Sequence, residues 1–288
     1  MDILNNLGIP KNSKVLMVHA DDAGLSHSEN RATMETLQYG SVNSYSIMVP
    51  CPWFYEIAQF SKNNAQLDTG IHLTLTCEWK NYKFGPVLPI SEVPSLVDQN
   101  GFFRPKRNDL QKNADPEQVF KELEAQVEKA LLFGIRPTHL DSHMYSVGAD
   151  AQFLEVYRSL GKQYDLPVLL AKDLFAMVGL TPTIDPSDLL FDHVHFGKFS
   201  DFEGNGLESY YDQVLDNLPT GLNMLLVHPA HDDDEMKGIT VDHPNFGAAW
   251  RQIDRNYFMG SRCAEKIRDN NIRMITWAEI KNGSHGAK

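Results

Sequence analysis

The chain has 288 residues, of which 42% are hydrophobic and 22% are charged, and its formal net charge at pH 7 is −12. This composition is typical of a globular protein and excludes wholesale disorder. The acidic excess argues against binding to nucleic acid or to an anionic membrane surface, because both need clustered Lys and Arg. The length allows about two domains, but α/β barrels commonly reach this size as one.

The first half of the chain alternates strands and helices. A β-rich run at residues 15–20 (VLMVHA) ends in two aspartates, and Ser26 with Glu29 then fits a capping box that opens a helix towards Gly40. A strand at residues 42–49, a helix at 53–61 and a strand at 70–76 follow. Residues 78–111 are rich in Pro, Asn and Gly without a steady period, so we expect a long excursion there, a candidate lid or substrate wall.

The second half continues the same alternation. Asp115 and Pro116 are typical of a helix start, and Gly134 of its end. The remaining pattern predicts strands at residues 137–143, 167–171, 222–227 and 272–276, helices at 151–164 and 207–218, and one long helix within 244–270 before a short final helix. Residues 174–206 give no clear assignment.

This order favours a single parallel α/β unit spanning residues 1–288, with 78–111 as an excursion from it. Seven or eight strands suit a closed barrel better than an open sheet. No G-x-G-x-x-G follows the first strand and no G-x-x-x-x-G-K-[ST] occurs, which argues against a nucleotide phosphate cradle.

Polar side chains that could bind a metal fall where strands end. Asp21 and Asp22 follow the first strand, His72 lies in the third, His143 ends the next one, and His228 follows residues 222–227. The carboxyl ends of parallel strands form the active face of such folds. Four strands therefore deliver carboxylates or imidazoles to one face.

Within residues 139–143 (HLDSH), His139, Asp141 and His143 point to the same side of a strand. A solvent-facing polar strand is the alternative, but a central parallel strand is covered on both faces. His143 is nearest the strand end and is the better ligand. His139 lies deeper and could be a hydrogen-bonded core histidine, while Asp141 could orient one of the imidazoles.

The adjacent carboxylates Asp21 and Asp22 suggest a division of labour. One aspartate alone would be a helix cap or turn former. Two together repel each other unless a cation or proton intervenes. We expect one to hold a metal and the other to act as base on an activated water. His72 alone would more often be a core histidine, and only its neighbours favour a ligand.

Several other residues have two interpretations. His231 and the acidic run at residues 232–235 follow His228 closely; the run is either a solvated loop or a loop at the pocket mouth, and His231 is a second acid–base or substrate-binding candidate. Trp79 and Tyr82 either belong to the core or stack on a sugar ring. Three scattered cysteines, without a CxxC pair, predict buried fillers rather than disulfides or a thiolate zinc site.

Five segments together resemble the YdjC/ChbG family of carbohydrate deacetylases. They are HADDAGLS, VNSYSIMVP, GIHLTLT, RPTHLDSHMY and LLVHPAHDD, in the family's order and approximate spacing, and the similarity covers about residues 15–275. The resemblance implies a deformed (β/α) barrel, one divalent metal ion, and hydrolysis of an N-acetyl group from a small amino-sugar derivative such as a chitooligosaccharide.

Carried over by motif, the metal ligands would be Asp22, His72 and His143, with Asp21 as base and His228 as the acid or oxyanion-binding group. Two departures bear on the pocket. The family often has ADDFG where this chain has Ala23, and often a further histidine where this chain has Met144-Tyr145. Neither removes a ligand, but both can reshape the pocket.

A ligand set of one carboxylate and two histidines suits a catalytic metal site, with Mg or Zn as the expected ion, although non-haem iron sites share the set. A metal-dependent sugar isomerase or epimerase on the same barrel is the alternative, and a sugar-binding protein with a dead site is a third reading. We expect a small N-acetylated sugar as partner and leave a homodimer open. No apolar run approaches the roughly 20 residues of a membrane span, and residues 1–14 do not resemble a secretory signal, which predicts a cytoplasmic protein.

Overall fold

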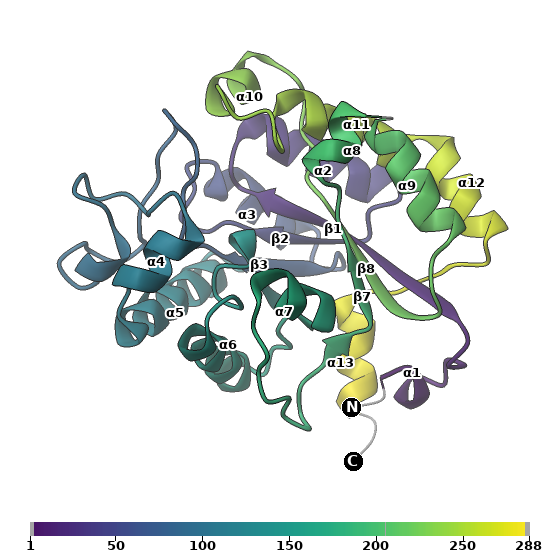
Figure 1. Cartoon of the computed structure of the whole chain (residues 1–288), viewed down its shortest axis with the longest axis horizontal. Coiled ribbons are helices and arrows are strands. Elements are labelled where there is room, and N and C mark those ends of the chain that lie inside the picture. The colour runs from purple at the N-terminus through teal and green to yellow at the C-terminus, as the bar shows by residue number, and fades with distance from the viewer. Residues whose placement is uncertain (1–2, 205, 286–288) are drawn as a thin grey trace.

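The computed structural model describes residues 3–204 and 206–285, and a sheet of parallel strands lies at its centre (Figure 1). Six strands follow one another in the order β4-β3-β2-β1-β8-β7, and β9 also pairs with β1. Their bounds are β1 Lys14–Ala23, β2 Ser44–Ile47, β3 Thr69–Leu73, β4 His139–Ser142, β7 His193–His195, β8 Gly221–Val227 and β9 Arg273–Met274.

Two further short strands, β5 and β6, come between β4 and β7 in the sequence. β4 and β7 are the two edges of the main sheet. β5 Leu170–Ala171 pairs in parallel with β6 Leu190–Phe191. A parallel bridge between Leu140 and Val168 links β4 to the segment that enters β5. β6 leads after one residue into β7, at the other edge of the main sheet. The strands therefore curl into a deformed α/β barrel, which confirms the predicted fold class.

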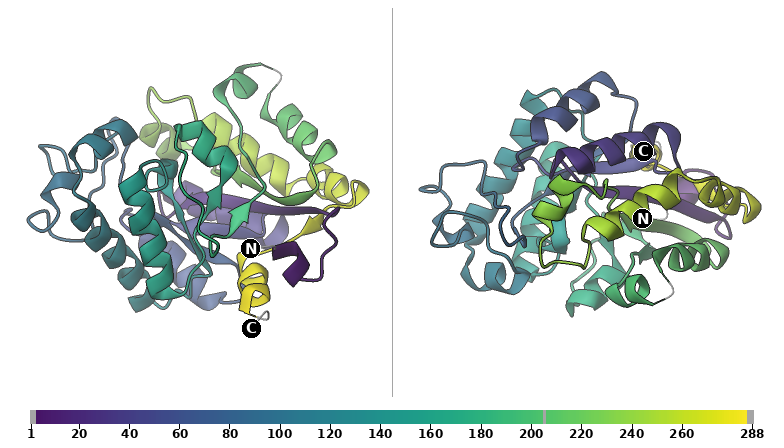
Figure 2. Two further views of the ribbon diagram at one scale, coloured as in Figure 1. Left: turned by 60° about the horizontal axis from the view of Figure 1, so that its bottom comes forward. Right: turned by 90° about the horizontal axis from the view of Figure 1, so that it is seen from above.

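Helices surround the curled sheet in all three views (Figures 1 and 2). Their bounds are α1 Ile3–Asn6, α2 His27–Tyr39, α3 Phe54–Asn63, η1 Pro94–Leu96, α4 Arg107–Asn113, α5 Pro116–Leu132, η2 His143–Tyr145, α6 Ala151–Tyr164, α7 Lys172–Val178, α8 Phe199–Glu203, α9 Leu207–Asp216, α10 Asp234–Ile239, α11 Ala248–Met259, α12 Ser261–Asp269 and α13 Trp277–His285.

Two expectations about the elements need correction. The single long helix predicted within residues 244–270 is two helices, α11 and α12, because Gly260 takes extended backbone angles between them (φ −78°, ψ 154°). The expected capping box is only half formed: Ser26 Oγ accepts from the backbone N–H of Glu29, but the Glu29 carboxylate binds Arg251 instead of returning to the cap.

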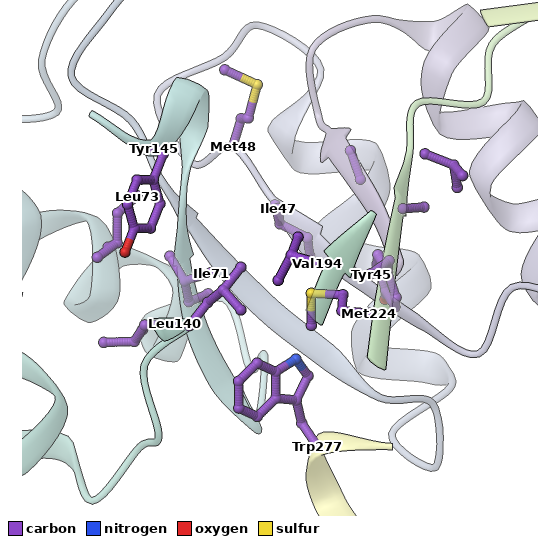
Figure 3. Packing of buried hydrophobic residues seen from close by; sticks show 14 of the residues in the cluster. Tyr45, Ile47, Met48, Ile71, Leu73, Leu140, Tyr145, Val194, Met224 and Trp277 are labelled. Atoms are coloured by element: carbon purple, nitrogen blue, oxygen red, sulfur yellow. The ribbon is translucent and has the colours of Figure 1, made fainter. Parts of the chain in front are cut away.

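Apolar side chains fill the space between the strands and their helices. Val194, Met224 and Trp277 point towards one another from β7, β8 and the start of α13 (Figure 3). All three belong to one continuous cluster of buried apolar residues. The cysteines are free and buried, as predicted. Within the described residues, no helix is long and apolar enough to cross a membrane.

One inward-facing layer of the strands is polar. His19 pairs in register with Ser44, and its Nδ1 is hydrogen-bonded to Ser44 Oγ at 2.8 Å. His72 pairs in register with Asp141. Gly70 makes room for this layer, because a Cβ at that position would lie 2.2 Å from the imidazole of its register partner His139. Close packing thus fixes polar groups below the carboxyl ends of the strands.

Candidate active site

A pocket of about 320 Å³ opens at the carboxyl ends of the strands. This volume is near the lower end of the roughly 300–1,000 Å³ that is typical of small-molecule sites. The metal and catalytic residues expected from the sequence all line it: Asp21, Asp22, His72, His143 and His228. Parallel strands explain the convergence, since their carboxyl ends meet at the same edge.

A β-bulge brings both aspartates to the same pocket. Adjacent residues on a regular strand point to opposite faces, so one of the two carboxylates would otherwise face away. The pairing of β1 with β2 shifts register between Ala20 and Ala23, and Asp22 has a φ of 64°. Bulges commonly re-aim side chains next to active sites. The left-handed conformation of Asp22 therefore places backbone strain at the candidate site.

Asp22, His72 and His143 form a compact cluster of possible ligands. Their ligand atoms all lie within 4.8 Å of one another. Asp22 Oδ1 is 3.4 Å from His72 Nε2 and 3.0 Å from His143 Nδ1. Each of the three residues is at least 95% buried, so bulk water does not screen the group.

A carboxylate lies behind each imidazole of this cluster. His72 Nδ1 is 2.9 Å from Asp141 Oδ1, and His143 Nε2 is 3.0 Å from Glu78 Oε2. A ring nitrogen that donates to a carboxylate leaves the opposite nitrogen with its lone pair, a common arrangement around metal-binding histidines. In both rings the opposite nitrogen faces Asp22. Asp141 also accepts from His19 and Ser46, so its position is fixed by the polar layer below.

These contacts perturb the pKa values of the cluster. Burial alone would lower the pKa of His143, but the charges of Glu78 and Asp22 outweigh it and raise that pKa to about 9. Burial likewise opposes the charges of Asp141 and Asp21 at His72, whose pKa is nevertheless raised well above its usual value. The pocket thus favours positive charge between its carboxylates.

This donor set fits a divalent cation. When His72 is neutral and its Nδ1–H donates to Asp141, Nε2 presents a lone pair towards a carboxylate oxygen of Asp22 only 3.4 Å away. Two facing acceptors repel each other unless a cation or a proton lies between them. One carboxylate and two imidazoles are ligands of divalent hydrolytic metals, and three protein ligands leave positions open for water and substrate.

Asp21 and His228 face each other beside the cluster. His228 Nε2 is 3.7 Å from Asp21 Oδ2, and His19 Nε2 is 3.3 Å from Asp21 Oδ1. The backbone N–H of His228 donates to Asp254. Burial, only partly offset by Asp22 and Asp21, lowers the pKa of His228 to about 4, so its imidazole is neutral at physiological pH.

Arg251 of α11 binds the other side of Asp22. Its Nη2 donates to Asp22 Oδ2 at 2.8 Å and its Nη1 to Glu29 Oε2 at 2.6 Å. The guanidinium is 1% exposed and lies over the ring of Trp79, 5.6 Å from its centroid. Arg251 therefore occupies Oδ2 of Asp22 and leaves Oδ1 directed at the two imidazoles.

Some residues singled out from the sequence lie elsewhere. His139 is fully buried below the pocket and stacks on Trp277, with ring centroids 4.8 Å apart, as expected for a core histidine. His231 does not line the pocket; its Nε2 contacts Glu35 of α2. Trp79 is fully buried against Arg251, so its ring is not available to stack on a sugar.

The acidic run at residues 232–235 also lies away from the pocket lining. Asp233 caps α10 by accepting from the backbone of Met236, and Ser28 Oγ donates to Asp233 and to Glu235 at 2.6 Å each. The run therefore ties α10 to the start of α2, and its position does not favour the alternative of a loop at the pocket mouth.

Three residues at or beside the site are not predicted from the sequence: Glu78, Arg251 and Asp254. Glu78 lies at the start of the excursion, where the sequence has no period that would indicate which side chains face the pocket. Arg251 and Asp254 lie on one face of an amphipathic helix, where three residues apart is the spacing of neighbours. A buried charge at such a position could have been suspected only from its apolar surroundings.

Known proteins of one family are similar to this chain along most of its length. The family model described as YdjC-like protein matches residues 15–269. The chain belongs to the YdjC-like family. A carbohydrate deacetylase of Thermus thermophilus is 33% identical over 98% of each chain, and a chitooligosaccharide deacetylase of Yersinia enterocolitica is 30% identical over 76% of this chain and 83% of its own.

The YdjC-like fold is also found among solved structures. The crystal structure of an Enterococcus faecalis protein, whose name suggests cellobiose-phosphate cleavage, superposes with a TM-score of 0.76 at 24% identity. The match covers 92% of this chain and 98% of that one. At this identity the likeness concerns the fold, and it supports the deformed barrel of a YdjC-like protein.

Proposed function

We propose that this YdjC-like protein is a metal-dependent hydrolase that removes the N-acetyl group from a small amino-sugar or oligosaccharide derivative. The observation that carries the proposal is the buried cluster of Asp22, His72 and His143 beside the carboxylate of Asp21 in one pocket. The names of the curated relatives, carbohydrate and chitooligosaccharide deacetylases, supply the reaction class.

Asp22, His72 and His143 would hold one divalent ion, Mg or Zn. Such an ion activates water at neutral pH and polarises the carbonyl of an amide. Asp141 and Glu78 orient the two imidazoles, and Arg251 fixes the carboxylate. The three ligands are therefore presented in a preorganised arrangement.

Asp21 accepts the proton of the attacking water, since its carboxylate lines the pocket next to the ligand cluster. His228 is neutral and donates its N–H to the oxygen that becomes negative in the tetrahedral intermediate. The proton held on Asp21 then passes to the leaving nitrogen, with His228 at 3.7 Å as its neighbour. A C–O bond forms, the C–N bond breaks, and acetate and an amine are released.

A screen of N-acetylated mono- and disaccharides, with parallel analysis of bound metal, tests this function. We expect equal amounts of acetate and free amine, loss of turnover after chelation, and recovery on adding Mg or Zn. Separate replacement of Asp22, His72 and His143 by Ala should each remove the metal. Ketose formation without acetate would instead establish an isomerase, and an unchanged metal content in a variant would remove that residue from the ligand set.

Replacing Glu78 with Gln should weaken metal binding by about 10- to 100-fold, as loss of a ligand-orienting carboxylate typically does. The amide can still accept a hydrogen bond but no longer attracts a cation or fixes which nitrogen of His143 carries the proton. Isothermal titration of the metal-free protein with zinc measures the change. Glu92→Gln is the matched control, because Glu92 is an exposed glutamate of the same excursion. Equal affinities in the two variants would contradict the role of Glu78.

A further inference from the structure

Part of the pocket lining is apolar. Met144, Leu174, Met177 and Phe196 line the pocket together with the cluster and form its apolar wall. They come from η2, from α7 and from the segment after β7. Figure 1 shows α7 beside β7, and α7 packs against both β5 and β7. Three separate elements thus supply the same kind of surface to one pocket.

The backbone that presents Met144 is strained. Met144 has a φ of 53° and Tyr145 a φ of 50°, directly after the candidate ligand His143. Non-glycine residues rarely adopt this left-handed conformation, and two in succession are rarer still. Strain of this kind is concentrated at ligand-binding sites. The position is also where the sequence departs from the histidine that the family often has.

The apolar wall is open to a ligand. Met144 is 39% exposed and Met177 is 44% exposed, although both line the pocket. Methionines exposed in a recess are adaptable surfaces for apolar groups. Two polar residues that also line the pocket have protein partners: Arg107 donates to the backbone oxygen of Met144, and His243 Nδ1 donates to the backbone oxygen of Asn245. The four side chains of the wall offer apolar contact rather than hydrogen bonds to hydroxyl groups.

We infer that the preferred substrate carries an apolar substituent, larger than the methyl of an acetyl group, which packs against Met144, Leu174, Met177 and Phe196 while its amide lies at the ligand cluster. This inference rests on the proposed function and narrows its substrate class. The apolar group is either the acyl chain of the amide or an alkyl group on the sugar. Both bury methylenes on the same wall.

Two substrate series separate these sources. The first is glucosamine bearing N-acetyl, N-butyryl or N-hexanoyl groups, and the second is the methyl, butyl and hexyl glycosides of N-acetylglucosamine. Amine release by the metal-loaded protein gives kcat/KM for each. We expect kcat/KM to rise by about fourfold for each methylene buried, in one series, until the wall is covered. The series that rises identifies the position of the apolar group.

The variant Met177→Gln keeps the side-chain length and alters a half-exposed residue, so folding is not at risk. We expect it to reduce the ratio of kcat/KM between the longest and shortest members by at least about threefold, with metal content unchanged, because a buried methylene loses its apolar partner. Leu132→Gln is the control, since Leu132 is 83% exposed on α5 and does not line the pocket. It should leave the ratio as it is.

The outcomes distinguish failure of this inference from failure of the proposed function. If the N-acetyl and methyl members are hydrolysed and kcat/KM stays flat or falls along both series, the apolar-substituent inference is wrong and the proposed function stands. If no member of either series releases an amine, both are wrong. A rise that Met177→Gln leaves unchanged would also overturn the assignment of this wall.

Discussion

Replacing Asp21 with Asn is expected to lower kcat for amide hydrolysis by about 10²- to 10⁴-fold, the usual contribution of a general base. The amide of Asn cannot accept the proton of water. The substitution preserves size, and Asp21 does not belong to the cluster of Asp22, His72 and His143. We therefore expect bound metal and the melting temperature to remain close to those of the unmodified protein.

The measurement combines acetate release with metal analysis of the same sample. Asp234→Asn provides the matched control, because Asp234 is an exposed aspartate at the start of α10 and does not line the pocket. It should retain turnover within about twofold, as exposed substitutions usually have small effects. Turnover of Asp21→Asn within tenfold of the unmodified protein, with metal bound, would assign the base to another group.

The barrel and the cluster of candidate ligands could be predicted because both follow from short, local patterns. Period-two alternation in residues 139–143 places His143 on the same side as Asp141, and parallel strands bring their carboxyl ends together. His72 was predicted only through its neighbours. In the structure, those neighbours lie within one small cluster. A residue at the end of a parallel strand can be assigned to the active face from the local sequence alone, without knowledge of long-range contacts.

The partners of the ligands could not be predicted, because they depend on contacts between distant segments. Glu29 contacts Arg251, 222 residues away, and the sequence around it indicated a helix cap instead. The bulge at Asp22 likewise depends on the register with β2. Proximity in sequence was misleading for His231: the chain turns away after His228, and His231 contacts α2 instead.

Residues 174–206 resisted assignment for a different reason. They contain the two- and three-residue strands β6 and β7 and the short helix α8, which are too brief to show a period. Part of the apolar wall of the pocket lies in this segment. The candidate ligands were therefore recognisable in the sequence, whereas the apolar wall of the pocket was not.

Replacing Arg251 with Met is expected to destabilise the protein by about 3–5 kcal/mol, the usual effect of breaking a buried ion pair by removing one partner. Met fills much of the volume but leaves the carboxylates of Asp22 and Glu29 buried without their cation. For a chain of 288 residues, this loss lowers the melting temperature by about 5–8 °C. Calorimetry of the metal-free protein measures it without a contribution from bound ion.

The double variant Glu29→Gln with Arg251→Met separates charge compensation from lost packing. Burial already raises the pKa of Glu29 well above its usual value, and Arg251 is the charge that opposes this effect. A neutral amide at position 29 removes one of the two uncompensated carboxylates, so the double variant should be more stable than Arg251→Met alone. Asp22 then keeps only His72 and His143 as positive partners, and a divalent ion can still neutralise its carboxylate. Zinc should therefore raise the melting temperature of the double variant by more than that of the unmodified protein.

The contradicting outcome is a double variant that is no more stable than Arg251→Met and on which zinc has no larger effect than on the unmodified protein. The guanidinium would then act through packing on Trp79 rather than as the counter-charge of the two carboxylates.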